Sequence, residues 1–138
     1  MDAGPIARTI AFVVPGVPVA WARAGSNNGM RFTPAKQRSF MAVLKAIAAE
    51  AMRGAPPIAG PVELSIRATW PAPSSWSAKK RAATRWRTSR PDADNCGKIV
   101  ADALNGICFL DDAQVVSLHV WKTIGSCAEL AVRITEIA

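Results

Sequence analysis

The sequence predicts a single α/β (α+β) domain with a mixed, mostly four-stranded sheet packed by two main helices. Half of the 138 residues are apolar, so one domain of this length can bury a real core. Four stretches have strand-like patterns and two longer ones have helical periodicity, while no repeat or long linker divides the chain. Residues 1–138 are therefore expected to form one domain with the order β-α-β-(α)-α-β-β.

The first half of the chain predicts a strand, a loop and a long helix. The apolar run at 10–14 indicates a strand. Residues 15–31 contain two prolines and three glycines, which favours a loop. A helix is expected next, with Thr33 as its cap and Pro34 at its first position, and it should run to about Arg53.

The middle of the chain predicts a strand and two more helical segments. Residues 62–68 alternate between apolar and polar side chains, as a half-buried strand does. The basic stretch that follows can form a short helix capped by Ser75 or Ser77. Residues 94–104 again have helical periodicity.

The end of the chain predicts two strands. Residues 114–122 and 130–134 carry alternating apolar side chains, with Gly125 and Ser126 between them. The short connection predicts that these strands pair as a hairpin. On the first of them, His119 is expected to face the same way as Ser117 and Trp121, at the surface or at an interface rather than in a catalytic site.

The composition favours a polyanionic partner. Seventeen Lys and Arg against ten Asp and Glu give a net charge of +7. A single His makes multi-histidine metal sites improbable. No signal sequence or membrane span is apparent, and the three cysteines, Cys96, Cys108 and Cys127, lack metal-site spacing, so we expect mostly buried, reduced thiols in a cytoplasmic protein.

The aspartates are concentrated in one segment of the chain, and their spacing suggests a metal site. Five of the six lie between residues 92 and 112, directly after the most basic stretch, and there is no Glu from 64 to 128. Asp92 and Asp94 would point to the same side of an extended chain, and a third carboxylate from a neighbouring loop would complete an oxygen site for Mg²⁺ or Mn²⁺. Lys98, one helical turn after Asp94, can reach the same space and neutralise phosphoryl charge.

Each of these residues also has a purely structural interpretation. Asp92 and Asp94 are good helix caps, and the adjacent acids at 111–112 are common in turns. Asp102 can form an i,i+4 ion pair with Lys98. The tryptophans of the basic stretch, Trp76 and Trp86, can stack on bases or pack against the protein.

Basic side chains around this region are the candidate DNA contacts. Seven of the seventeen lie between residues 79 and 98, and two more occur in the glycine-rich loop of the first half. The predicted DNA-binding residues are Lys79, Lys80, Arg81, Arg85, Arg87, Arg90, Arg23 and Arg31.

Three ordered blocks resemble the signature of the RusA family of Holliday junction resolvases. They are RPDADNxxK at 90–98, DALNG at 102–106 and DDAQVV at 111–116, and the similarity extends to Lys122. Further likeness to phage-type members, in segments nearer the N-terminus, extends the resemblance from about residue 10 to 136. A block this long is far more specific than an isolated pair of aspartates.

The resemblance implies a small α/β homodimer that cuts four-way DNA junctions with Mg²⁺ or Mn²⁺. It assigns the essential carboxylates to Asp92, Asp94 and Asp112, the essential lysine to Lys98, and an accessory acid to Asp111. Each subunit would then carry one site and cut one strand. Cys96 and Gly97 depart from the family pattern, which usually has a larger apolar residue after the Asn.

We therefore expect a metal-dependent junction resolvase acting in recombination and repair, of bacterial, phage or prophage origin, with no membrane partner. One alternative is a general nuclease for branched or flap DNA. The other is a basic DNA-binding module without catalysis, in which the acids are only caps.

Overall fold

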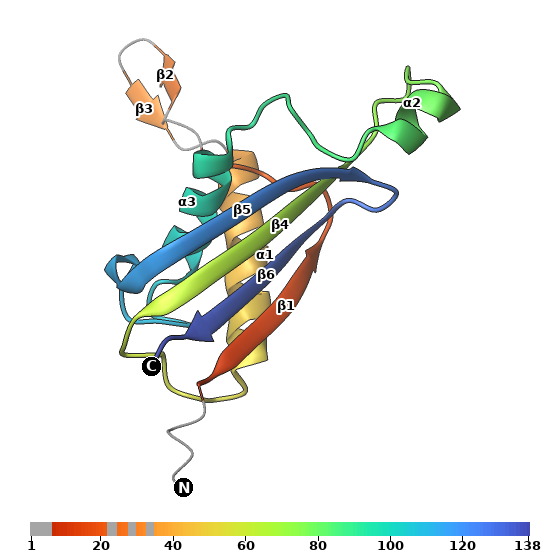
Figure 1. The fold of residues 1–138 in the computed structure, drawn as a ribbon. Coiled ribbons are helices and arrows are strands. Elements are labelled where there is room, and N and C mark those ends of the chain that lie inside the picture. The colour runs from red at the N-terminus through yellow and green to blue at the C-terminus, as the bar shows by residue number, and fades with distance from the viewer. Residues whose placement is uncertain (1–6, 22–24, 28–29, 33–34) are drawn as a thin grey trace, which may run out of the picture.

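The structure is a computed structural model that describes residues 7–21, 25–27, 30–32 and 35–138. Its elements along the chain are β1 (Thr9–Pro15), β2 (Gly25–Asn27), β3 (Met30–Phe32), α1 (Ala35–Met52), β4 (Val62–Pro71), α2 (Ala78–Ala83), α3 (Ala93–Leu104), the 3₁₀ turn η1 (Asp112–Gln114), β5 (Val115–Gly125) and β6 (Glu129–Glu136) (Figure 1). The predicted fold class and element order are confirmed. The predicted loop at 15–31 contains β2 and the start of β3, and the predicted cap residues Thr33 and Pro34 lie outside the described residues.

The four main strands are arranged in the order β1-β6-β4-β5. Strand β4 is antiparallel to β6 and parallel to β5, so the sheet is mixed. The predicted hairpin of the last two strands is wrong, because β4 lies between them. The physical reason is burial: the helix-facing side chains of β4, Val62, Leu64 and Ile66, are inaccessible to solvent, which a central position achieves and an edge does not. The parallel pair β4 and β5 is joined by the crossover through α3.

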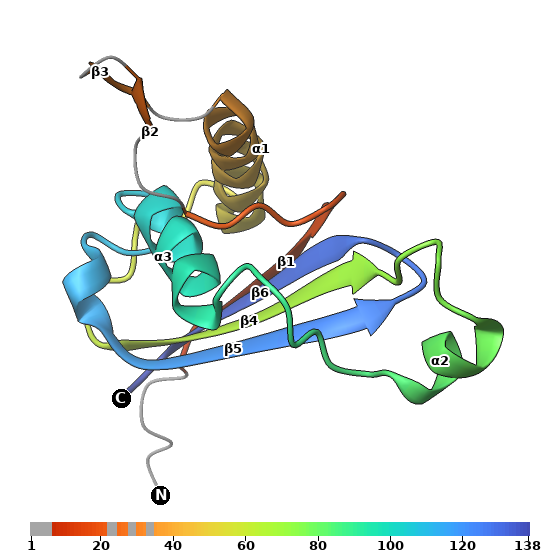
Figure 2. The same cartoon turned by 90° about the horizontal axis from the view of Figure 1, so that it is seen from above.

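Helices α1 and α3 lie on one face of the sheet, and the core lies between them and the sheet (Figure 2). The predicted apolar side of α3 is buried, with Ile99, Val100 and Leu104 in the core. The opposite face of the sheet has no helix over it in the described part of the chain (Figure 2). The short helix α2 stands at one end, away from the core, and Ser77 is its cap, because the Ser77 hydroxyl accepts a hydrogen bond from the Lys80 amide at 3.1 Å.

Two of the three cysteines are buried, Cys96 and Cys108, and Cys127 is exposed. Burial raises the pKa of the Cys108 thiol to about 11. Burial also raises the pKa of the Cys96 thiol, so both buried thiols stay protonated at neutral pH. No helix among the described residues is long and apolar enough to cross a membrane.

Gly97 lets α3 approach β5 closely. A Cβ atom at this position would lie 3.1 Å from the Leu118 Cδ2 atom and 3.3 Å from the Val120 Cγ2 atom. We expect Gly97→Leu to lower the free energy of unfolding by about 1–3 kcal/mol, because overpacking outweighs the better helix propensity of leucine. Urea titration measures this, and Gly60→Leu is the control, since a Cβ at Gly60 meets nothing within 4 Å. Equal stability of the two variants would contradict the tight packing.

Candidate active site

The first two aspartates lie at the N-terminal end of α3. Asp92 is the N-cap residue, but its side chain makes no capping hydrogen bond. Asp94 lies in the first turn of the helix. The expectation that Asp92 and Asp94 share one extended segment is therefore wrong. Both side chains are exposed. The interpretation of Asp92 as merely a cap therefore loses its main support, and both carboxylates are available to a ligand.

Two cations hold the segment that leads into this helix. The Lys122 ammonium donates to the carbonyl oxygens of Ser89 at 2.8 Å and Pro91 at 2.6 Å. The Arg87 guanidinium donates to the Arg90 carbonyl oxygen through Nε at 2.9 Å and Nη2 at 2.6 Å. These contacts fix the backbone next to Asp92 and bring positive charge to it.

Arg87 is further held by an aromatic ring. Its guanidinium lies 4.7 Å from the centroid of the Trp70 ring, which is buried. Arg87 was predicted only as a DNA contact, yet its hydrogen bonds and its stacking show a positioning role. The charges of Arg87 and Lys122 oppose the rise in the pKa of the Cys96 thiol that burial causes. The positioning role of Lys122 was not predicted, although the residue itself was part of the resemblance.

Lys98 is exposed and does not pair with Asp102. Its ammonium lies 4.3 Å from the centroid of the Trp21 ring. The Trp21 amide donates to the Asn95 carbonyl oxygen at 3.0 Å, which ties the segment after β1 to α3. No ion pair joins Lys98 to Asp102 in the described chain, so that structural interpretation of Asp102 is wrong. Sequence reasoning missed Trp21, because only the fold brings it to α3.

The other acids gather at the C-terminal end of α3. Asp111 caps η1, since its carboxylate accepts from the Ala113 amide at 3.2 Å and the Gln114 side chain accepts from the Asp111 amide at 2.8 Å. A hydrogen bond with Asp111 raises the pKa of Asp112, and the nearby charges of Asp111 and Asp102 raise it further. The same hydrogen bond lowers the pKa of Asp111. Asp102 therefore belongs with this acidic group.

The two acidic groups lie at opposite ends of one helix. Helix α3 has 12 residues, which corresponds to a length of about 18 Å. Within the described residues, no three His, Cys, Asp or Glu side chains are grouped so that they could hold a metal ion. The structure thus brings Asp92 near Asp94, and Asp111 near Asp112, but it does not bring Asp112 to Asp92 within one chain.

A groove of about 680 Å³ lies beside Asp92. One wall is formed by the segment from Val17 to Trp21, and the other by residues that precede and begin α3. The groove contains three basic residues and one acid, and its polar lining includes Lys36, Arg87, Arg90, Asp92 and Asn95. Its charge and its position next to the Asp92 carboxylate suit a phosphate-bearing strand.

The remaining predicted DNA contacts are spread over several elements. Lys79, Lys80 and Arg81 are exposed on α2. The Arg81 guanidinium also holds the preceding loop, because it donates to the carbonyl oxygens of Pro73 and Trp76. Arg85 is likewise exposed. Arg23 and the Arg31 side chain lie outside the described part of the chain.

An α+β domain that holds exposed carboxylates beside a cationic groove is typical of small endonucleases. The chain belongs to the RusA family, since it matches the family described as "Endodeoxyribonuclease RusA" over residues 15–135. Membership implies an endonuclease that resolves Holliday junctions, with branched DNA as its substrate. The chain is also 36% identical to the uncharacterized protein YqaN of Bacillus subtilis (strain 168) over 140 residues, which cover 94% of this chain and 97% of YqaN.

Proposed function

We propose that this protein is a metal-dependent, structure-selective endodeoxyribonuclease that resolves four-way DNA junctions by paired symmetric cleavage in recombination and repair. The observation that carries the proposal is the pair of exposed carboxylates, Asp92 and Asp94, of which Asp92 lines a cationic groove in a RusA-family chain. In a DNA-binding module without catalysis, an exposed acid that makes no capping hydrogen bond would only repel the phosphates that approach it.

Asp92, Asp94 and Asp112 are the proposed ligands of Mg²⁺ or Mn²⁺, with Asp111 as an accessory acid. Carboxylate oxygens are the hard ligands that these ions prefer, and none of the proposed ligands is in a salt bridge of the described structure. When bound, such an ion lowers the pKa of a water molecule and stabilises charge on the phosphoryl oxygens. Lys98 adds a positive charge one helical turn from Asp94, where it can stabilise the departing oxygen.

A homodimer reconciles this ligand set with the separation of the two acidic groups. In a two-fold dimer whose α3 helices run antiparallel, the Asp92 end of one copy lies next to the Asp112 end of the other. Each of the two sites is then shared between subunits, which differs from the expectation that each subunit carries a complete site. Two identical sites suit the symmetric nicking that a junction requires.

The surface beside α3 supports such a dimer. The side chains of Val116 and Leu118 are 64% and 48% exposed, although they lie on the helix-facing side of β5. In the described structure, residues 85–87 hydrogen-bond to the outer edge of β5 only near Thr123, so the rest of this edge is free to pair with a second copy. Antiparallel pairing of the two β5 edges would give the required antiparallel arrangement of the helices.

The decisive experiment is a cleavage assay on a four-way junction, a fork and a linear duplex, with Mg²⁺ or with EDTA, mapped to single nucleotides. We expect symmetric cuts in the junction that require the metal. Equal cutting of the fork would indicate a general branched-DNA nuclease. Absence of cutting with either Mg²⁺ or Mn²⁺, despite junction binding, would indicate a binding module.

Exposed lysines of α2 are expected to contribute to DNA affinity through phosphates. Changing Lys79 and Lys80 together to Ala should weaken junction binding and reduce the slope of log affinity against log salt by about 1.8, since each phosphate contact contributes about 0.9. Arg81 is left in place because it also holds the loop. Binding isotherms at several salt concentrations measure the slope, with Lys45→Ala on α1 as the control. An unchanged slope would mean that α2 does not contact DNA.

A further inference from the structure

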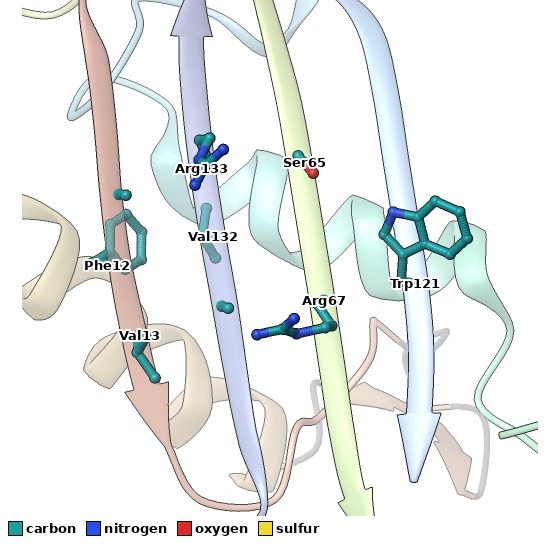
Figure 3. A pocket seen from close by; sticks show the side chains of 9 residues that line it. Phe12, Val13, Ser65, Arg67, Trp121, Val132 and Arg133 are labelled. Carbon is teal, nitrogen blue, oxygen red and sulfur yellow. The ribbon is translucent and has the colours of Figure 1, made fainter. Parts of the chain in front are cut away.

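The face of the sheet opposite the helices carries a hollow of about 490 Å³ (Figure 3). Strand register places Val13, Ala131, Arg67 and Trp121 in one row across all four strands. The next row holds Ala11, Arg133, Ser65 and His119. Ala11, Ala131 and Ser65 are the small residues of its lining and leave space open. Larger side chains, among them Arg67, Arg133 and Trp121, stand around it (Figure 3).

Two neighbouring tryptophans border this face at the edge of the sheet. The Trp121 and Trp86 side chains are 51% and 44% exposed, and their ring centroids are 5.7 Å apart. The Arg85 guanidinium lies 4.6 Å from the Trp86 ring centroid. Trp86 is held there by its backbone, since the flanking residues hydrogen-bond to β5. Exposure of two adjacent tryptophans indicates an interaction surface rather than core packing.

The charges on this face favour a polyanion. Arg67 and Arg133 occupy the two middle rows, and both are exposed. Of the acids, Glu63 is in the row beyond Arg133 and is bound to His119 at 3.0 Å, and Glu129 is in the row beyond Arg67. A ligand over the hollow therefore meets arginines first and the glutamates only at the margins.

We propose that this open face, defined by Arg67, Arg133, Trp121, Trp86 and Arg85, binds unpaired single-stranded DNA. Aromatic rings stack on bases of any sequence, and arginines bind the phosphates, as on other single-strand platforms. The hollow falls within the range of about 300–1,000 Å³ found for small-molecule pockets, so it has room for an unstacked base.

This site is separate from the proposed cleavage site. Asp94 and Lys98 belong to α3 and Asp92 is its N-cap residue, and α3 lies on the other face of the sheet (Figure 2). The inference thus adds a second DNA contact to the proposed function and does not depend on cleavage. A surface of this kind would hold a strand that has left the duplex, while the groove beside Asp92 holds the strand to be cut.

The test is fluorescence anisotropy of a labelled 15-nucleotide oligothymidine in EDTA, where no cutting occurs. We expect Trp121→Ala to weaken binding roughly 5- to 150-fold, the effect of losing one base–aromatic stack. Trp121→Phe should restore part of the affinity, because a ring remains. Val43→Ala is the control, because this exposed side chain belongs to α1 on the other face of the sheet, and it should bind like the parent protein.

Several outcomes would overturn the inference. Unchanged affinity in Trp121→Ala, or an equal loss in Val43→Ala, would remove the face from single-strand binding. A change of Trp121→Ala from dimer to monomer in sedimentation, with affinity unaltered, would make the face a contact between copies. A third result is that the parent protein fails to cut junctions while Trp121→Ala still loses single-strand binding. That result would support the single-strand site and reject the proposed nuclease activity, so the two proposals can fail separately.

Discussion

Replacing Asp92 by Asn is expected to abolish junction cleavage and to preserve junction binding. The substitution removes a charged ligand oxygen, so the single-turnover rate should fall by at least about 10³-fold, the upper value for loss of one electrostatic group. Affinity depends on Lys and Arg contacts to phosphates and should stay equal or increase, because a negative charge near the DNA is lost. Cleavage with Mg²⁺ and gel shift in EDTA measure the two effects.

The same outcome is expected for Asp94→Asn and Asp112→Asn. Asp102→Asn is the control, since Asp102 lies near Asp112 but is not a proposed ligand, and it should retain most of the cleavage rate. Substantial cutting by Asp94→Asn would remove that residue from the site.

A mixture of two inactive variants tests whether the site is shared. In a dimer of one Asp92→Asn and one Asp112→Asn subunit, shared sites place both substitutions in one site and leave the other intact. Mixing the two proteins, with subunit exchange, should therefore restore nicking of one strand of the junction without paired cleavage. If each subunit held a complete site, every site in the mixture would be damaged, and no nicks would appear.

Lys98 is the residue for which chemistry and simple attraction of DNA predict different results. Lys98→Ala should lower the single-turnover rate at saturating junction by about 10²–10³-fold if its charge stabilises the transition state. A role in binding alone would cost only about one phosphate contact, which saturation conceals. Lys79→Ala on α2 is the matched control and should cleave at the parent rate once the junction is saturating.

Lys98→Arg sharpens the distinction. Arginine keeps the charge, but it is planar and effectively cannot release a proton, and it must fit the place over the Trp21 ring where the ammonium now lies. We expect Lys98→Arg to remain strongly impaired at saturating junction. Full single-turnover rates in both variants would reduce Lys98 to one of many cations that attract DNA.

Much of the fold was predictable because the information is local. Apolar side chains alternate in β4 and recur with helical periodicity in α3, because these are the side chains that face the core. Both patterns can be recognised from residues that are close together in the sequence. The Ser77 cap is equally local, since it needs only a hydroxyl at the right place before a helix. The position of β4 between the last two strands was not predictable, because pairing depends on burial summed over the whole sheet.

The sequence by itself determined the main helices and strands, their order, the positive charge and the family, since each depends on residue types at fixed spacing. Only the tertiary structure decided that Asp92 and Asp112 lie at opposite ends of α3, that Lys98 lies over Trp21 rather than pairing with Asp102, and that the tryptophans of β5 and its neighbouring segment meet on an open face. These are relations between residues far apart in the chain. They depend on how helices and strands pack to exclude water, and no local spacing encodes that packing.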